Sequence, residues 1–406
     1  MTERIAIIGA GQAGLQAAVS LRQAKFVGAV TLFGDEPTPP YQRPPLSKAY
    51  LKGELERERL FLKPLTYFEQ HDVDLRLGER VRLIDRGGRK LVLESGVEEP
   101  YDRLLLATGA PPRRLIAPGA DLQNIFYLRS LADSDALRGI LSSTGRVLIV
   151  GAGYIGLEVA AVARAAGREV TVLEMADRVL ARVASPPVSD FFEARHRESG
   201  VDLRLGATLK GFLGREGAVV GAELVSGEVI DCASVLIGIG AVPAVELAAS
   251  AGLEVDGGVI VDERARTSDE AIWAAGDCTN FPSPLYNRRM RLESVPNAIE
   301  QAKVAATNMA GGDAVYDATP WFWSDQYDVK LQTAGLSEGH DERVQRGDPG
   351  SGRFSIWYFA GRRLLAVDAI NDPAAFAASK RLIGTEISSP EAIANAEFDL
   401  KSLLVK

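Results

Sequence analysis

The 406-residue chain has few of the side chains on which metal centres and disulfide frameworks depend. Its two cysteines, Cys232 and Cys278, are too far apart in sequence to form a C-x-x-C pair, and its three histidines are scattered. We therefore expect neither a disulfide framework nor a cysteine- or histidine-bound metal site.

Long apolar runs and an excess of positive charge are also missing. No apolar run reaches the roughly 18 residues that a membrane span needs, and a strand expected from about residue 4 leaves no room for a signal peptide. The chain has 46 basic and 54 acidic residues, and this net charge of −8 argues against a general nucleic-acid or anionic-membrane binder. The length allows two or three domains, and the cytoplasm is the expected location.

A dinucleotide fingerprint lies near the middle of the chain. Val147–Val150 is apolar like a buried parallel strand, Gly151, Gly153 and Gly156 fit G-x-G-x-x-G, and residues 157–166 are typical of an Ala-rich helix. The first glycine allows a tight turn, the second lets a pyrophosphate approach the backbone, and the third lets the helix pack close to the strand. The phosphates are expected at the positive helix end, although a lone motif of this kind also occurs as a plain glycine-rich turn.

The residues around this motif indicate which nucleotide it takes. The next expected strand, 169–173, ends in Glu174, an acid that accepts from a ribose 2′-hydroxyl and repels a 2′-phosphate. The motif therefore favours NADH over NADPH. We also assign Tyr154 and Ile155, inside the motif, and Gly240, at the end of an expected strand 235–240, to this site.

The same fingerprint occurs at the start of the chain. An apolar strand Arg4–Ile8 is followed by Gly9, Gly11 and Gly14 and by a helix expected from Gln12 to about residue 24. Two copies imply two dinucleotides, most simply FAD at the first and a nicotinamide cofactor at the second. This pairing is much more specific than either copy alone.

The acid that follows the second strand is displaced in the first copy. Gly34 stands where Glu174 stands in the second copy, and Asp35 and Glu36 come directly after it. We favour Asp35 for the FAD ribose, the alternative being that both are loop acids in water. The Pro-rich stretch Pro37–Lys48 that follows predicts a loop ending in Ser-Lys, a candidate for contact with the flavin.

Together with the two fingerprints, four further stretches resemble one known family over essentially the whole chain. The stretches are 44–50 (Pro-Pro-Leu-Ser-Lys-Ala-Tyr), 153–158 (Gly-Tyr-Ile-Gly-Leu-Glu), 293–298 (Glu-Ser-Val-Pro-Asn-Ala) and 321–327 (Trp-Phe-Trp-Ser-Asp-Gln-Tyr). They are similar to the FAD-dependent, NADH-using ferredoxin reductases of bacterial haem-monooxygenase and aromatic-dioxygenase systems, the putidaredoxin reductase type.

The resemblance implies an α/β fold like that of glutathione reductase. Two Rossmann-like dinucleotide-binding domains would be followed by a C-terminal α+β domain. The implied boundaries are 1–112 with 246–318 for FAD, 113–245 for NADH, and 319–406 for the β-rich C-terminal domain. The residues that match family FAD contacts are Ala13, Asp35, Lys48, Val81, Arg129, Asp277 and Val295.

The resemblance also implies a small set of residues at the reacting part of the flavin. Glu158 matches a carboxylate that pairs with Lys48, and Trp323 matches an aromatic at the flavin edge beside the nicotinamide. Hydride transfer needs no acid–base side chain, because the cofactors carry the chemistry. Lys48 would stabilise the anionic reduced flavin, and Glu158 would keep that charge paired. The alternative for Lys48 is a solvated loop lysine, that for Glu158 is an acid on a helix surface, and that for Trp323 is an aromatic of the core.

The electrons must then leave without a redox cysteine pair, which the early loop of related two-dinucleotide flavoproteins carries. One-electron transfer to a 2Fe–2S ferredoxin fits best. Arg288, Arg289 and Arg291 form the densest basic cluster and are expected either to dock this acidic partner or to form an ordinary solvated loop. Other acceptors (a rubredoxin, a quinone, nitrite-reductase coupling, oxygen) and a non-catalytic NADH sensor related to apoptosis-inducing factor stay open.

Overall fold

The computed structural model describes residues 3–141 and 144–404, and these fall into two compact units. The first unit contains 3–42, 58–111 and 242–322, and the second contains 43–57, 112–241 and 323–404. The chain therefore leaves and re-enters each unit. We describe each unit by itself.

The first unit is built on a five-stranded sheet in which every neighbouring pair is parallel. The strands, in spatial order, are β17 (Ile272–Ala274), β7 (Arg103–Leu106), β1 (Arg4–Ile8), β2 (Ala29–Gly34) and β3 (Val73–Leu77). Most of their apolar residues are buried, as expected for a parallel sheet covered by helices, and the exceptions are Ala29 at the start of β2 and Leu75 and Leu77 in the edge strand β3. The strands that were predicted at 4–8 and 30–33 are present.

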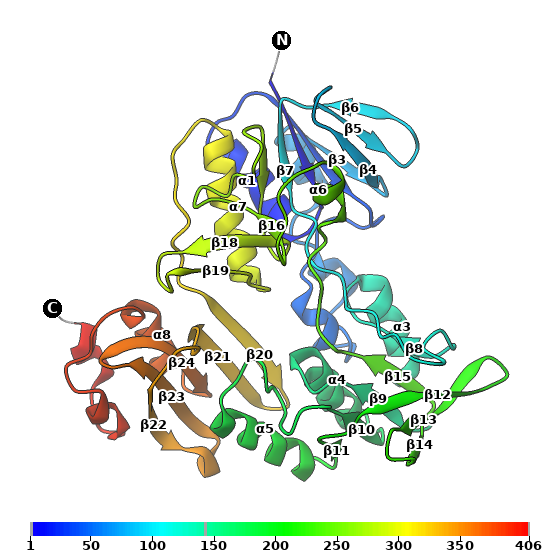
Figure 1. The fold of residues 1–406 in the computed structure, drawn as a ribbon, viewed down its shortest axis with the longest axis vertical. Helices are drawn as coiled ribbons and strands as arrows, with labels where there is room; N and C mark the ends of the chain where they lie inside the picture. The colour runs from blue at the N-terminus through cyan, green and yellow to red at the C-terminus, as the bar shows by residue number, and fades with distance from the viewer. Residues whose placement is uncertain (1–2, 142–143, 405–406) are drawn as a thin grey trace. The chain divides into compact units, whose positions relative to one another are not determined.

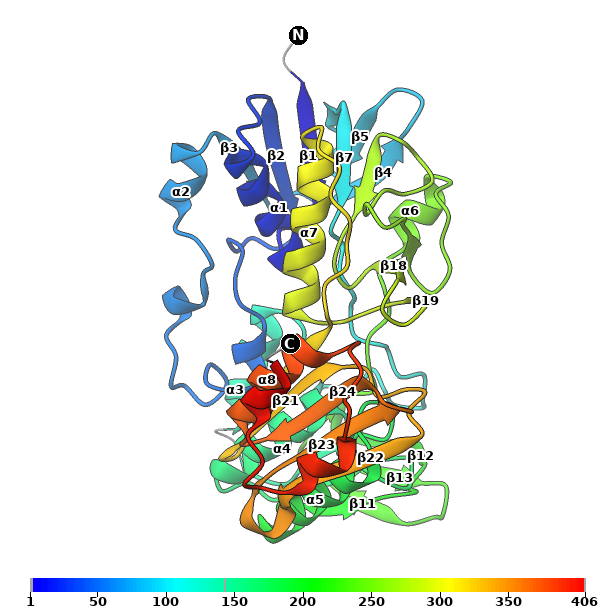
Figure 2. The same ribbon diagram turned by 90° about the vertical axis from the view of Figure 1, so that its left-hand side faces the viewer.

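Two long helices cover this sheet. Helix α1 (Gln12–Gln23) follows β1, and α7 (Val295–Met309) lies beside it, as both ribbon views show (Figures 1 and 2). The contact is close because most of the residues that these two helices contribute to the apolar core are alanine. Ser294 caps α7 by accepting from the N–H of Asn297 at 3.2 Å, and Pro296 occupies the first turn, where it breaks no hydrogen bond.

Smaller elements complete the first unit. They are α2 (Leu65–Gln70), α6 (Glu246–Ser250), a 3₁₀ turn Arg57–Leu60 at its margin, a sheet of β4 (Val81–Asp85), β5 (Lys90–Leu93) and β6 (Glu98–Pro100), and a sheet of β16 (Val259–Ile260), β18 (Thr279–Ser283) and β19 (Arg288–Met290).

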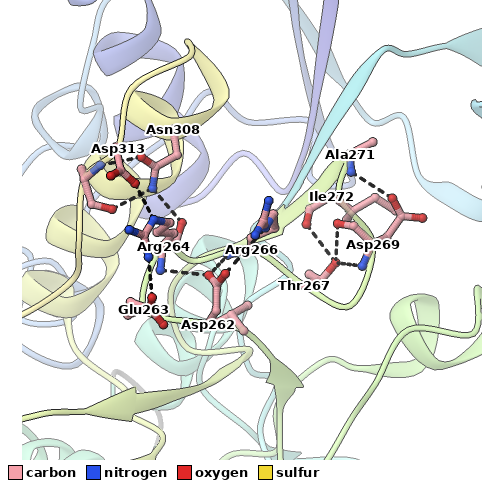
Figure 3. A network of polar contacts seen from close by, with 12 residues as sticks. Asp262, Glu263, Arg264, Arg266, Thr267, Asp269, Ala271, Ile272, Asn308 and Asp313 are labelled. Atoms are coloured by element: carbon pink, nitrogen blue, oxygen red, sulfur yellow. Dashed lines mark hydrogen bonds and ion pairs between the residues drawn. The ribbon is translucent and has the colours of Figure 1, made fainter.

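A polar network fixes the chain between β16 and β17 (Figure 3). Asp262 accepts from the backbone N–H groups of Arg264 and Arg266 at 2.9 and 2.8 Å. Arg264 forms ion pairs with Asp313 and Glu263, and its carbonyl accepts from Asn308 of α7 at 3.0 Å. This network holds the start of β17 in place, and β17 leads directly into the Gly-Asp turn at 276–277.

The second unit contains another sheet of five strands, again parallel between all neighbours. In spatial order they are β11 (Asp202–Arg204), β10 (Val170–Leu173), β9 (Val147–Val150), β15 (Ser234–Ile237) and β8 (Ile125–Phe126). The helices of this part are α3 (Leu131–Leu141), α4 (Tyr154–Ala165) and α5 (Pro186–Glu198), and an antiparallel sheet contains β12 (Leu209–Arg215), β13 (Ala218–Leu224) and β14 (Val229–Asp231).

The C-terminal part of the second unit is a sheet in the order β20-β21-β24-β23-β22, drawn in gold to orange in Figure 1. Its strands are β20 (Trp321–Gln326), β21 (Val329–Gly335), β22 (Glu342–Asp348), β23 (Arg353–Ala360) and β24 (Arg363–Ile370), and α8 (Pro373–Leu382) follows them. This sheet shares one apolar core with β9 and α4. Phe191 of α5 packs edge-on against Phe354 of β23, with 5.2 Å between ring centroids.

Two local predictions need correction. Helix α4 begins at Tyr154 and not at Leu157, because the helical turn already includes the third glycine of the motif. Residues 44–47 form a 3₁₀ helix within the predicted loop, since Pro44 and Pro45 have backbone angles that suit a first helical turn. In residues 3–141 and 144–404, no helix is both long and apolar enough to cross a membrane.

Candidate functional site

The two fingerprint turns are built in the same way. Gly9 and Gly151 have φ of +111° and +105°, a region that L side chains rarely adopt. A β-carbon on Gly9 would lie 2.2 Å from the carbonyl oxygen of Ala107, and one on Gly151 would lie 2.5 Å from that of Gly238. Both first glycines are therefore required by the fold itself.

The third glycines are required by the helices. A β-carbon on Gly14 would lie 1.9 Å from the carbonyl oxygen of Gly9, and one on Gly156 would lie 2.1 Å from that of Gly151. The first turn of each helix thus packs directly against the turn that precedes it.

The second glycines are different, because protein atoms do not crowd them. Among the described residues nothing lies within 4 Å of a β-carbon built on Gly11, and the nearest atom to one built on Gly153 is at 3.9 Å. Both have extended backbone angles, and no described side chain caps either helix. An open glycine in front of uncapped helical N–H groups is the cradle that a pyrophosphate needs. The residues present therefore fit a dinucleotide at each turn.

Glu174 stands at the second turn and supports it. Its Oε2 accepts from the N–H of Ala152 at 2.7 Å, and its Oε1 accepts from the N–H of Ala176 at 2.8 Å. A carboxylate oxygen has a second lone pair, so each oxygen still has acceptor capacity for a ribose hydroxyl. The acid that was predicted to select NADH is thus also part of the turn.

We predict that Glu174→Arg lowers kcat/KM for NADH by about 10- to 100-fold, because one or two hydrogen bonds to a charged acceptor are lost. NADPH use should improve relative to NADH. It should stay below wild-type NADH use, since Ala152 also loses its acceptor. Glu174→Gln is the matched control, which keeps one acceptor and should only relax the preference. The measurement is flavin reduction by each nucleotide, and an unchanged preference would remove Glu174 from the ribose site.

The first unit distinguishes Asp35 from Glu36. Glu36 accepts a hydrogen bond from the hydroxyl of Tyr41 at 2.6 Å, whereas the exposed side chain of Asp35 has no partner among the described residues. Gly34 leaves no room for the acid of the second copy, because a β-carbon there would lie 2.7 Å from that of Ala10. Asp35 is accordingly the available acid next to this turn.

Gln301 of α7 is a candidate that sequence reasoning missed. Its side chain is fully buried, and its Oε1 accepts from the N–H of Gly276 at 2.8 Å and from the hydroxyl of Thr279 at 2.9 Å. Its Nε2 has no partner among the described residues. The glutamine therefore shapes the turn that carries Asp277. The only signal in the sequence is a polar residue on the Ala-rich face of the helix.

The other predicted FAD contacts have diverse settings. Val81 is buried at the start of β4, and Val295 is the partly buried first residue of α7. Arg129 is partly buried, and its carbonyl accepts from Arg43 at 2.7 Å. Ala13 is buried in the first turn of α1.

Lys48 and Glu158 form an ion pair inside the second unit. Lys48 Nζ lies 2.7 Å from Glu158 Oε2, and the side chains are 17% and 2% exposed. The 3₁₀ helix at 44–47 places Lys48, and the fifth residue of α4 is Glu158. The structure thus joins two residues that the resemblance alone had paired.

Two serines that were not predicted complete the surroundings of Glu158. The Ser47 hydroxyl donates to Oε2 at 2.5 Å, and the Ser324 hydroxyl donates to Oε1 at 2.7 Å. Burying a carboxylate costs several kcal/mol unless it is paired and hydrogen-bonded, and here both oxygens are satisfied. Glu158 is therefore held in one position by two other segments of the chain, residues 47–48 and the strand that carries Ser324.

The aromatic candidates lie next to this pair in sequence. Trp323 is partly buried, and because side chains alternate along β20 it points to the face opposite Ser324. The phenol of Tyr154 hydrogen-bonds with Thr333, and burial raises its pKa above the ordinary value. Ile155 is 42% exposed. Gly240, with φ of +106°, lies in the turn after β15.

His196 of α5 is fully buried and contacts Gln326 of β20, and burial lowers its pKa to about 4. An unfolded histidine titrates near 6.5, so between about pH 6.5 and 4 only the unfolded chain binds the proton and stability falls as pH falls. We predict that the wild type loses about 2 kcal/mol more than His196→Gln between pH 7 and pH 5. Urea unfolding of the flavin-free proteins checks this, and parallel losses would contradict it.

Neither cysteine is suited to redox chemistry. Both are buried and free, and burial raises the pKa of Cys232 to about 12 and that of Cys278 above its ordinary value. The reactive form of cysteine is the thiolate, which these surroundings disfavour.

The three arginines of the predicted docking cluster differ from one another. Arg289 donates to the backbone carbonyl of Val261 at 2.7 Å and to that of Asn280, so its side chain holds β19 in place. Arg291 forms an ion pair with Glu293. Arg288 is exposed on β19.

Comparison with known proteins agrees with this geometry. A family model described as pyridine nucleotide-disulphide oxidoreductase matches residues 3–302, and one described as reductase C-terminal matches residues 321–404. Rhodocoxin reductase of Rhodococcus erythropolis is 46% identical over 99% of this chain and 94% of its own length. Putidaredoxin reductase CamA of Pseudomonas putida is 42% identical over 99% and 97%.

A solved structure shows the same architecture. The covalent putidaredoxin reductase–putidaredoxin complex matches with a TM-score of 0.95 and 41% identity, over 99% of this chain and 98% of the other. The chain therefore belongs to the putidaredoxin reductase-like ferredoxin reductases, which are oxidoreductases that use FAD and NAD(H).

Proposed function

We propose that this protein passes electrons from NADH through FAD to a 2Fe–2S ferredoxin that serves a haem monooxygenase or a Rieske dioxygenase. The observation that carries the proposal is the pair of fingerprint turns, each closed by two crowded glycines and open at the middle one. The buried Lys48–Glu158 pair supports it, as does the burial of both cysteines, Cys232 and Cys278.

We assign the cofactors to the following residues and domains. FAD would be held by Gly9, Gly11, Ala13, Gly14, Asp35, Lys48, Val81, Arg129, Asp277 and Val295. NADH would be held by Gly151, Gly153, Tyr154, Ile155, Gly156, Glu174 and Gly240. The proposed domains are 1–112 with 246–318 for FAD, 113–245 for NADH and 319–406 at the C-terminus.

Bound FAD supplies a hydride acceptor that can release its electrons one at a time. The side chains of this protein supply position and charge. Lys48 would provide a positive charge that favours the anionic reduced state, and Glu158 fixes the ammonium group and would offset part of its charge. We propose that Trp323 packs beside the nicotinamide and excludes water. No protein group has to accept or donate a proton for hydride transfer.

We propose that the ferredoxin docks on the cluster of Arg288, Arg289 and Arg291. Arg288 is exposed on β19, and reversing the charge of Arg289 or Arg291 would also break the contacts that these two make within the protein. Arg288→Glu is expected to raise KM for ferredoxin several-fold at low salt and to leave reduction of FAD by NADH unchanged. An unchanged KM at low salt would discard the cluster as a docking surface.

Steady-state turnover with purified acceptors tests the proposed function. With NADH as donor, a plant-type or oxygenase-type 2Fe–2S ferredoxin should be reduced much faster than a rubredoxin, a quinone or oxygen. Preferential reduction of rubredoxin would identify rubredoxin, and not a ferredoxin, as the acceptor. Prompt FAD reduction with no acceptor turnover would favour an NADH sensor. Because NADH is a cytoplasmic reductant, the cytoplasm stays the proposed location.

A further inference from the structure

Glu158 is the end of a longer chain of buried hydrogen bonds within the second unit. Ser324 and Gln326 on β20 and His196 on α5 are each no more than 1% exposed. Alternation along the strand places Ser324 and Gln326 on one face of β20, toward α4 and α5. The hydride-transfer chemistry described above uses none of these three side chains.

The contacts form an unbroken series. Ser324 Oγ lies 2.7 Å from Glu158 Oε1, and Gln326 Nε2 lies 3.2 Å from Ser324 Oγ. His196 Nε2 lies 2.8 Å from Gln326 Oε1, and the Tyr327 hydroxyl lies 3.1 Å from His196 Nδ1.

The atoms in this series allow one direction of donation. Gln326 Oε1 can only accept, so His196 Nε2 must donate to it, and the neutral ring then accepts from Tyr327 at Nδ1. The amide of Gln326 is thereby oriented with its nitrogen toward the oxygen of Ser324. The hydrogen bond from Gln326 Nε2 occupies a lone pair of Ser324 Oγ, so the hydroxyl proton of Ser324 is donated to Glu158.

The state of His196 keeps this direction in place. Burial lowers its pKa to about 4, with Arg195 adding to the effect, so the ring is neutral at physiological pH. A neutral ring has one donor and one acceptor, whereas a protonated ring would donate at both nitrogens and oppose the hydroxyl of Tyr327. Every donor in the series accordingly points toward the carboxylate that is paired with Lys48.

We propose that Ser324, Gln326 and His196 are positioning residues for the Lys48–Glu158 pair. By directing the Ser324 proton at Glu158, they draw negative charge away from the carboxylate and leave Lys48 more of its positive charge. The anionic reduced flavin is favoured as a result. This inference rests on the proposed function, in which Lys48 acts on the flavin.

Ser324→Ala and Ser324→Thr form a matched pair for the test. Ser324→Ala removes a hydrogen bond to a charged group, so we expect hydride transfer from NADH to be about tenfold slower. The equilibrium for two-electron reduction should fall about tenfold, which is a midpoint potential about 30 mV lower. Ser324→Thr restores the hydroxyl and should restore both quantities to within about twofold. Gln326→Met should shift them in the same direction by less.

The direction of the series has its own test in the flavin-free protein. Nitrogen-15 NMR of the His196 ring should show the proton on Nε2 at neutral pH, slow to exchange in wild type and in Ser324→Ala. Exchange should become fast in Gln326→Met, because the acceptor is lost. A proton on Nδ1 would reverse the series and overturn the proposal.

The outcomes separate this inference from the proposed function. A wild-type protein that NADH reduces promptly, together with a Ser324→Ala variant of unchanged rate and potential, would end the inference and leave the proposed function standing. A Ser324→Thr variant as impaired as Ser324→Ala would also end it, because packing would then explain the loss. A wild-type protein that NADH does not reduce would overturn both.

Discussion

A Gly153→Val variant is expected to fold, to bind FAD, and to lose at least about 100-fold in affinity for NADH. The expected loss follows from the helix N-terminus, where a side chain would keep the pyrophosphate away from two or more N–H groups. Each charge-assisted hydrogen bond contributes about 1.5–3 kcal/mol, and two of them exceed the roughly 2.7 kcal/mol that corresponds to 100-fold.

The structure permits this substitution without harm to the fold. Gly153 has φ of −80° and ψ of −178°, which valine readily adopts, and the nearest atom to a β-carbon is 3.9 Å away. Gly156→Ala should instead destabilise the protein, because its β-carbon would lie 2.1 Å from a carbonyl oxygen. Gly139→Ala in α3 is the matched control for Gly156→Ala, since no described atom lies within 4 Å of a β-carbon built on Gly139.

Equilibrium titration of the FAD-loaded proteins with NAD⁺ or NADH measures the affinity, and urea unfolding checks the fold. A Gly153→Val protein with wild-type affinity for NADH would show that the open glycine is not where a pyrophosphate binds. The equivalent change in the first copy, Gly11→Val, is expected to give a folded protein that does not retain FAD.

Lys48→Met is expected to have two separable effects. It leaves the carboxylate of Glu158 buried without its cation, which costs about 3–5 kcal/mol of stability in comparable pairs. It should also slow hydride transfer to the flavin by at least about tenfold, because a positive charge that favours the reduced state is removed.

The double variant Lys48→Met/Glu158→Gln distinguishes the two effects. A neutral glutamine no longer needs a cation, so most of the lost stability should return, and the two changes should be strongly non-additive. Hydride transfer should stay slow, because the lysine charge is still missing. Urea unfolding of the flavin-free proteins and stopped-flow reduction of the FAD-loaded proteins give the two quantities. Recovery of both together would mean that Lys48 has only a structural role.

The sequence predicted those parts of the fold that depend on local pattern. The strands at 4–8 and 147–150 and the glycines after them were identified because a dinucleotide turn requires a fixed order of residue types within one short segment. The family resemblance of the chain also paired Lys48 with Glu158, and the structure places these two side chains in contact. Helix α5 and the hairpins β12 to β14 were not predicted.

The rest of the site depends on contacts between distant segments. Ser324 reaches Glu158 across 166 residues of sequence, and His196 reaches Gln326 across 130. No periodicity within β20 or α5 encodes which partner each will find, because only the packing of α4 and α5 against the C-terminal sheet brings them together. His196 was noted in the sequence only as one of three scattered histidines. Gln301 of α7 is similar, since its role follows from its contacts with Gly276 and Thr279 in the turn after β17.

Anaerobic stopped-flow mixing of the FAD-loaded protein with NADH, followed by a 2Fe–2S ferredoxin, tests the central claim most directly. We expect NADH to bleach the flavin absorbance in a phase that saturates with NADH concentration, and two equivalents of oxidised ferredoxin to restore it. A protein that binds no FAD, or whose bound FAD stays oxidised in excess NADH, would contradict the account.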